Sequence, residues 1–264
     1  MATDKVISRR ALKQRLNLFF RRARNYDLGI AEVIQCAQKV GQTAVFGGML
    51  RDLLLYGEEG FKSDIDLVVA GNQEDLHSAL HRFSPERTAF GGYRLTYKHS
   101  KIDIWCLRDT WAFREGLVTG SGFHDLLKTT FFNWDAIVYL VDDGQFLFGD
   151  TYIDSIAERI LDINLEPNPN RLGVLRRTFE RVYRDRAALT PRLANYVNQV
   201  IESQMRKKLI CSNGDCNDKF LFFCSSLHRH LEESPNAPFE LHPQLAFWAS
   251  GDQVLNIDSR VLNG

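Results

Sequence analysis

The sequence predicts an α/β domain with a small mixed or antiparallel β-sheet, followed by an all-helical domain. In the first 150 residues, short stretches with strand-like alternation are separated by segments in which apolar residues recur at helical spacing. From about Tyr152 the alternation fades and helical spacing takes over, and Pro167 and Pro169 precede a strongly helical segment. We therefore expect three regions: a basic N-terminal helix within residues 1–28, the α/β domain over residues 29–150 and the helical domain over residues 151–264.

A basic amphipathic helix is expected before the α/β domain, because Leu12, Leu16, Phe19 and Phe20 recur on one side of it. Further on, the triplet at residues 142–144, Asp-Asp-Gly, suits the turn of a β-hairpin. Helices are expected at residues 8–26, 30–40, 50–55 and 74–83, and strands at residues 43–46, 64–69, 93–97, 102–107, 136–141 and 145–148.

The helical domain should contain a long helix over residues 170–188 and a second one over residues 192–207. Pro191 separates them, since proline cannot continue a helix without losing a hydrogen bond. A third helix is expected over residues 221–231.

Composition narrows the class of protein. Hydrophobic residues make up 44% and charged residues 25% of the chain, as in ordinary soluble globular proteins. No apolar run approaches the ~20 residues of a membrane span. The basic N-terminus lacks the apolar core of a secretory signal. We expect a cytoplasmic protein with no membrane partner.

Charge is distributed unevenly, although the net charge is zero. Eight Lys or Arg residues and no acid lie between Lys5 and Arg24, and seven arginines accompany two acids between Arg171 and Arg192. Local basic surfaces of this kind can bind a phosphate backbone. Each can equally be a solvated helix face.

The most informative segment runs from Val45 to Ala70. A glycine pair, Gly47 and Gly48, follows one apolar strand, and Asp64 and Asp66 alternate at the start of the next. Alternate residues of a strand project from the same face, ~7 Å apart. Two carboxylates this close repel each other unless a cation lies between them, so the spacing indicates a Mg²⁺ site. Taken alone, the glycine pair is also typical of a turn, and Asp-x-Asp of an exposed strand end.

This segment resembles the polymerase-β-like nucleotidyltransferases, and more narrowly the head domain of bacterial poly(A) polymerases and class II CCA-adding tRNA nucleotidyltransferases. The resemblance extends over residues 44–186. The matching motif, Gly-Gly-x-x-Arg-Asp followed by a leucine-rich half-helix and Asp-x-Asp, is met here by Gly47, Gly48, Arg51, Asp52, Leu53, Leu54, Leu55, Asp64 and Asp66.

The resemblance implies a metal-dependent nucleotidyl transfer. Asp103 is the candidate third carboxylate of a two-metal Mg²⁺ site, brought beside Asp64 and Asp66 by antiparallel pairing; otherwise it is an exposed strand acid. Gly47, Gly48 and Arg51 would hold the triphosphate, since a guanidinium suits phosphate oxygens. Asp52 would share this nucleotide site, or it orients Arg51 or caps the helix.

Three further nucleotide-binding candidates depart from the family pattern. Asp135 stands where the family has Asn, and it can still accept hydrogen bonds. Asn168 replaces the Asp of the family's base-reading Asp and Arg, whereas Arg171 keeps the Arg. The base preference of the family therefore does not transfer to this chain.

A possible RNA-binding face lies on the predicted helix over residues 170–188. Arg177, Arg181 and Arg184 recur at i, i+4 and i+7, so they share one face of that helix. They could contact an RNA backbone, or they could pair with acids of the α/β domain and hold the two domains together.

The chain has five cysteines, an odd number that argues against a disulfide framework. Cys36 and Cys106 fall in a helix and a strand, where buried thiols are expected. Cys211, Cys216, Cys224 and His228 could build a zinc site, although their spacing is not that of a zinc knuckle. The alternative is that Cys224 and His228 are simply packed on one helix.

The sequence as a whole predicts a template-independent, Mg²⁺-dependent nucleotidyltransferase that adds a nucleotide from ATP or CTP to an RNA 3′ end, with tRNA as the favoured acceptor. One alternative is transfer to a protein hydroxyl or a small molecule, as in toxin- or defence-type enzymes. The other is a non-catalytic module that binds nucleotide or RNA.

Overall fold

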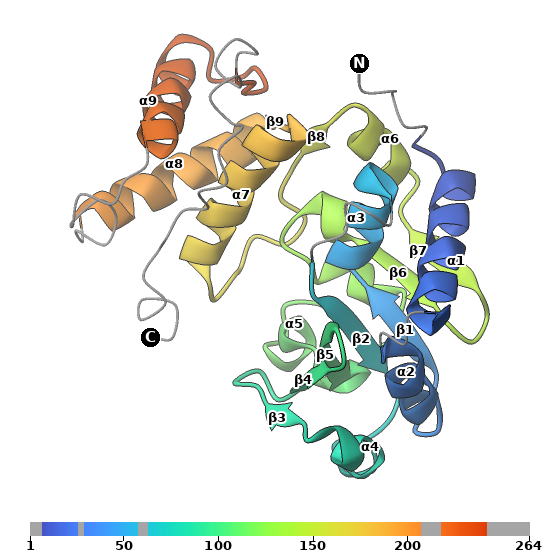
Figure 1. Cartoon of the computed structure of the whole chain (residues 1–264). Helices are drawn as coiled ribbons and strands as arrows, with labels where there is room; N and C mark the ends of the chain where they lie inside the picture. The colour runs from blue at the N-terminus through green and yellow to red at the C-terminus, as the bar shows by residue number, and fades with distance from the viewer. Residues whose placement is uncertain (1–6, 26–28, 58–62, 207–217, 242–264) are drawn as a thin grey trace. The chain divides into compact units, whose positions relative to one another are not determined.

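The structure is a computed structural model that describes residues 7–25, 29–57, 63–206 and 218–241 (Figure 1). The chain divides into two compact units, Met1–Ala157 and Glu158–Gly264. The two units are described separately below.

The first unit is built around a seven-stranded sheet with the order β3-β4-β5-β2-β1-β6-β7. Neighbouring strands are antiparallel, with the exception of β2 and β5, which are parallel. The strands are β1 (Thr43–Phe46), β2 (Ile65–Val69), β3 (Glu86–Arg87), β4 (Tyr93–Tyr97), β5 (Ser100–Cys106), β6 (Ile137–Leu140) and β7 (Gln145–Phe148). The predicted α/β class with a mixed sheet is confirmed.

The parallel pairing of β2 with β5 corrects the expected antiparallel approach of Asp103. The chain leaves β2 through α4 (Gln73–Leu80) and crosses back to the sheet before the β4–β5 hairpin. Strand β4 pairs with the edge of β5 that faces away from β2. The other edge of β5 pairs with β2, the two strands run parallel, and Asp103 lies directly opposite Asp66. The carboxylates come together as predicted, by a different strand direction.

One face of the sheet is covered by α4 and by α2 (Ile30–Gln38). The ring of Tyr93 on β4 packs against His77 of α4, with 5.5 Å between ring centroids. On the same face of β4, the Tyr97 hydroxyl donates a hydrogen bond to Glu32 of α2 over 3.1 Å. Strand residues on this face, among them Val45, Leu67 and Ile104, are fully buried.

The opposite face is half covered. Phe46, Val68 and Val138 pack there against η3 (Asp125–Lys128) in one apolar cluster, with Trp105 at its edge. Towards β4 the same face carries charged residues in place of this cover. The open, charged part of this face is where the candidate site lies.

Two helices meet behind β1. Helix α3 (Gly48–Tyr56) starts directly after β1, and α1 (Arg9–Asn25) packs against it (Figure 1). The Arg15 guanidinium of α1 donates hydrogen bonds to the Leu53 and Leu54 carbonyls in the last turn of α3. A cation at this end offsets the negative pole of the helix, so α1 holds α3 in place.

The second unit contains α7 (Arg171–Asp185), α8 (Pro191–Arg206) and α9 (Asp218–Glu233) among its described residues. Two short parallel strands, β8 (Ile160–Leu161) and β9 (Ala188–Leu189), also pair there, so the unit is helical apart from this pair. Phe179 of α7 packs on Phe220 and Phe223 of α9 at 5.6 Å between ring centroids. Within the described residues, no helix combines the length and the apolar character needed to cross a membrane.

Candidate functional site

The three predicted carboxylates lie on the charged part of the sheet. Asp66 of β2 and Asp103 of β5 are direct neighbours in the parallel register, so their side chains project from the same face. Asp64, which is exposed, precedes β2 by one residue and stands two residues before Asp66. The structure therefore brings together the three acids that the sequence singled out.

Arg94 on β4 holds Asp103. Its Nε and Nη2 atoms donate hydrogen bonds to the two carboxylate oxygens of Asp103, over 2.8 and 2.6 Å. This bidentate contact raises the pKa of Arg94, and 57% of the Arg94 side chain remains exposed. Arg94, Asp103, Asp66 and Phe46 thus form one row across four neighbouring strands.

The surroundings of Asp66 disfavour its charged form. Burial, followed by the nearby charges of Asp103, Asp64 and Asp135, raises the pKa of Asp66 to about 8, against a smaller opposing effect of Arg51. Carboxylates that face each other without a balancing cation are expected to retain a proton in this way. A divalent cation at this position would reverse the effect.

The acids offer suitable donors for Mg²⁺, since carboxylate oxygens are the ligands that this hard cation prefers. In this arrangement, however, no group of three His, Cys, Asp or Glu side chains among the described residues is disposed to hold a metal ion. The bidentate contact with Arg94 accounts for the orientation of Asp103. The donor set therefore fits a divalent cation in its chemistry and in its strand positions, and Asp103 must exchange Arg94 for the ion.

The glycine pair forms the turn between β1 and α3. Gly47 adopts a φ of 69° and a ψ of −123°, a conformation that favours glycine, and it is the N-cap of α3 without any side chain to cap the helix. A Cβ on Gly48 would lie 3.4 Å from the Arg51 guanidinium. The turn thus brings bare backbone at a helix N-terminus close to a cation, an arrangement suited to phosphate oxygens.

Arg51 lies between two carboxylates behind this turn. Its Nε and Nη2 atoms donate to Asp52 Oδ1 over 3.0 and 2.8 Å, and its Nη1 atom donates to Asp135. Ser63 donates a further hydrogen bond to Asp52. Arg51 and Asp52 are buried, at 5% and 2% exposure. Of the three roles expected for Asp52, the structure agrees with the orientation of Arg51, and no side chain caps α3. Asp135 joins this pair.

The remaining nucleotide-binding candidates belong to the second unit. The Asn168 side chain accepts a hydrogen bond from the Asn170 backbone N–H over 2.8 Å, which shapes the loop before α7. Arg171, at the start of α7, is exposed, and its guanidinium lies 5.6 Å from the centre of the Tyr196 ring. Their part in reading a base stays a prediction.

The arginines of α7 do not share one exposed face. Arg181 is only 6% exposed, and its Nη1 atom donates to Asp185 Oδ2 over 2.8 Å. Arg184 donates from Nε to the other Asp185 oxygen over 3.0 Å and keeps 39% of its side chain exposed. Arg181 thus pairs with a buried carboxylate one turn further along its own helix, not with an acid of the α/β domain, because a buried carboxylate requires a cation. The part of the three arginines in RNA binding stays a prediction.

Two of the four residues of the predicted zinc site, Cys211 and Cys216, lie outside the described residues. On α9, burial raises the pKa of the Cys224 thiol to about 12. His228 is exposed and lies 3.3 Å from Glu232 on the next turn. Cys36 and Cys106 are buried at 7% and 2% exposure, as expected of packed thiols.

Sequence reasoning did not identify Arg94 or Ser63 as parts of this site. Arg94 contacts Asp103 across a strand pair, so only the register of the β4–β5 hairpin could have identified it. Alternation in that hairpin does carry the signal, since both residues stand at polar positions between buried ones. Nothing in the sequence marks Ser63 as the partner of Asp52.

Comparison with known proteins gives matches among solved structures. Neither a protein-family model nor a curated protein sequence matches the chain. A CCA-adding enzyme in an apo form matches with a TM-score of 0.54 and 19% identity, over 90% of this chain and 57% of that chain. A tRNA-processing enzyme complex gives a TM-score of 0.52 and 20% identity, over 76% of this chain and 57% of that chain.

A CCA-adding enzyme solved with CTP matches with a TM-score of 0.51 and 18% identity, over 78% of this chain and 51% of that chain. The chain thus spans between 51% and 57% of the length of these solved structures. Identities of 20% and below establish the fold alone. The chain has the fold of CCA-adding and tRNA-processing enzymes, which confirms the predicted resemblance to the polymerase-β-like class II head.

Proposed function

We propose that this chain is a Mg²⁺-dependent nucleotidyltransferase that adds NMP from ATP or CTP to an RNA 3′ end, with tRNA as the acceptor class. The observation that carries the proposal is the register of β2 and β5, in which Asp66 and Asp103 are side by side. Asp64 is near enough for its charge to act on Asp66. The fold shared with CCA-adding enzymes supports it.

Asp64, Asp66 and Asp103 would hold the metal. When bound, Mg²⁺ supplies charge stabilisation at the phosphoryl oxygens and a lower pKa for the attacking hydroxyl. In the transfer, the acceptor hydroxyl oxygen bonds to the α-phosphorus, the bond to the β-phosphate oxygen breaks, pyrophosphate leaves and the hydroxyl proton passes to water. Arg94 would release Asp103 to the metal and remain nearby as a cation for phosphate.

The turn at Gly47 and Gly48 would receive the triphosphate. Backbone N–H groups of the first turn of α3 point out of the helix end, where they suit anionic oxygens. Arg51 stands directly behind this turn, and Asp52 fixes its orientation through two hydrogen bonds. Arg51 thus supplies positive charge from a held position.

An RNA backbone would find exposed cations on α1. Arg10, Lys13 and Arg21 are exposed there, while Leu12 and Leu16 bury the opposite side of the helix. Such a surface binds phosphates without reading sequence. It takes over part of the role expected of α7, where Arg181 is buried.

The test combines purified protein, total RNA, Mg²⁺ and each labelled NTP in turn. We expect labelled RNA from the wild type with ATP or CTP, and none from Asp66→Asn, which keeps the shape of the side chain but removes its charge. Asp154→Asn, a change at an exposed acid of α6 (Tyr152–Ala157), serves as the matched control and should label RNA like the wild type.

A second candidate function is transfer to a protein hydroxyl or a small molecule. The burial of Arg181 favours it, because one of the expected backbone contacts is lost. Label that enters protein or a small molecule, with RNA left unlabelled, would establish this alternative. Absence of any transfer, together with NTP binding, would indicate a non-catalytic module and contradict the proposal.

A further inference from the structure

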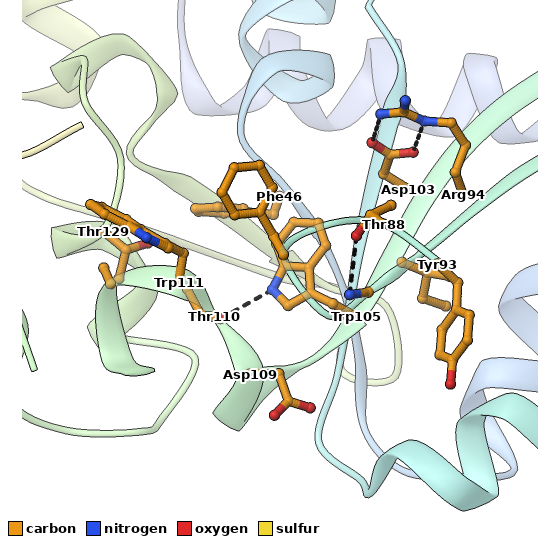
Figure 2. A pocket seen from close by; sticks show the side chains of 14 residues that line it. Phe46, Thr88, Tyr93, Arg94, Asp103, Trp105, Asp109, Thr110, Trp111 and Thr129 are labelled. Atoms are coloured by element: carbon orange, nitrogen blue, oxygen red, sulfur yellow. Dashed lines mark hydrogen bonds and ion pairs between the residues drawn. The ribbon is translucent and has the colours of Figure 1, made fainter. Parts of the chain in front are cut away.

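A pocket opens on the charged face directly beside Asp103. It has a volume of about 270 Å³ and is bounded by the Arg94–Asp103 pair on one side and by aromatic side chains on the other (Figure 2). The aromatic residues that line it are Phe46, Phe90, Tyr93, Trp105 and Trp111. No role was predicted for Phe90 or Trp111.

The aromatic lining differs from an ordinary core. Phe46 and Trp105 meet edge to face, with centroids 6.2 Å apart and planes at 73°, which fixes both rings. Phe90 lies in the β3–β4 turn at the pocket and is 53% exposed. About half of the Phe90 side chain is therefore accessible to a ligand at the pocket.

The polar groups of the pocket are largely committed to the protein itself. The Trp105 indole donates to Thr110 Oγ1 over 3.0 Å, and the Thr110 hydroxyl donates to the Leu107 carbonyl over 2.8 Å. The Thr129 hydroxyl donates to the Leu126 carbonyl over 2.8 Å, and Thr88 accepts from the Gly92 N–H over 3.1 Å. These hydroxyls therefore have few donors left for a ligand, so the pocket offers stacking surface in preference to hydrogen-bond readout.

With a volume of about 270 Å³, the pocket lies just below the ~300–1,000 Å³ that is usual for sites of drug-sized ligands. It suits one flat ring. A ring inserted there would hold its attached sugar next to Asp103 and Arg94, whereas the triphosphate site lies at the glycine turn before α3. In the proposed transfer, the hydroxyl that must lie beside Asp103 is the attacking hydroxyl of the acceptor, so the sugar next to the pocket belongs to the acceptor.

We infer that this pocket binds the terminal nucleobase of an acceptor RNA by stacking, without selecting its identity. The inference rests on the proposed function and adds to it the way in which the acceptor end is seated. Stacking on aromatic side chains tolerates any base, because every base has a π-face. The exposed Arg94 guanidinium offers a cation to the adjoining phosphate.

The test measures binding without metal or NTP, so it does not depend on catalysis. Two short 5′-labelled RNAs are compared by fluorescence anisotropy in EDTA: one ends in an ordinary nucleoside, and the other in a riboside that lacks the base. We expect the ordinary RNA to bind the wild type roughly 5- to 150-fold more tightly, the range of one base stacked on an aromatic side chain.

Two variants assign this preference to the pocket. Phe90→Ala removes an exposed ring and should reduce the ratio of the two affinities severalfold, and Trp111→Leu should do the same. Phe222→Ala is the matched control, since it removes a partly exposed phenylalanine from α9 in the second unit, and it should leave the ratio unchanged.

Equal binding of the two RNAs by the wild type would overturn the inference, as would a preference that survives both pocket variants. Displacement of the RNA by a tyrosine-containing peptide that then accepts nucleotide would overturn it in favour of a protein acceptor. These results are separate from failure of the proposed function, which appears as the absence of nucleotide transfer with Mg²⁺ and NTP.

Discussion

Asp66 and Asp103 lie side by side, but their surroundings differ. Arg94 donates two hydrogen bonds to Asp103, whereas burial and neighbouring carboxylates raise the pKa of Asp66 to about 8. Single side chains therefore decide how this face behaves with and without a cation. The first three predictions concern such side chains.

Removal of the Asp66 carboxylate should abolish catalysis and leave the fold intact. Asp66→Ala, or Asp64→Ala, takes away a proposed metal ligand, and loss of metal charge stabilisation of several kcal/mol corresponds to at least a ~100-fold decrease in transfer rate. Turnover is measured at saturating Mg²⁺, and circular dichroism reports the fold. Undiminished turnover in either variant contradicts the assignment of the metal site.

The stability of the metal-free protein should fall as the pH rises from about 4 to about 8. Asp66 binds its proton more tightly in the folded chain than in the unfolded chain, so its contribution is complete at low pH and is lost as it ionises. Melting temperatures should therefore decline over this range in EDTA, less so in Asp66→Asn. Mg²⁺ should raise the melting temperature more at pH 8 than at pH 6; an equal effect at both values would count against metal binding here.

Arg51→Lys should weaken NTP binding by at least about tenfold, the effect of losing one hydrogen bond to a charged group. A lysine has a single nitrogen and cannot reproduce the fork that contacts both Asp52 and Asp135. Calorimetric titration with NTP measures the affinity, and thermal melting measures stability. If stability falls and affinity stays the same, Arg51 has a structural role only.

At the scale of elements, the two basic segments, α1 and α7, place their cations differently. Helix α1 shows its cations to solvent and uses Arg15 to hold the end of α3. Helix α7 instead turns Arg181 inward to Asp185, which is fully buried at 1% exposure. Basic side chains therefore supply surface charge on α1, whereas Arg181 of α7 is part of the packed interior.

Arg181→Ala should destabilise the second unit by about 1–3 kcal/mol, the cost of leaving a buried polar group short of a partner. The cost stays below that of an isolated charge because Arg184 also donates to Asp185. Chemical denaturation measures it, and RNA affinity should be unchanged. A drop in RNA affinity without loss of stability would restore Arg181 to the RNA-binding face.

Neutralising α1 should change the salt dependence of RNA binding. In the triple variant Arg10→Gln, Lys13→Gln and Arg21→Gln, each lost contact with single-stranded RNA should reduce the slope of log K against log salt by ~0.7. The change should be similar for RNAs of different sequence. An unchanged slope would show that α1 is a solvated face.

At the scale of the whole molecule, the fold class was predictable from the sequence, because strand alternation and helical spacing mark its elements. Asp64 and Asp66 were predictable from their alternation, whereas Asp103 was identified through the resemblance to the nucleotidyltransferases. The direction of β5 was not predictable, since hairpin and crossover connections fit the same apolar pattern. Neither Arg94 nor the pocket at Trp111 was predictable, because each arises from strand register and loop placement. The burial of Arg181 was not predictable either, because helical spacing does not show which arginine pairs with Asp185 inside the unit.

The parallel pairing of β2 with β5 also affects the order in which the parts of the candidate site form during folding. Hairpins such as β4–β5 and β6–β7 join strands that are close in sequence, whereas Ile65 meets Ile102 only after α4 and the hairpin have been laid down. Non-local pairings of this kind are slow to form, because the entropy of closing the intervening chain must be lost first. We therefore expect Asp66 and Asp103 to meet after the hairpins have formed, so that Mg²⁺ slows unfolding and leaves the early refolding rate unaffected.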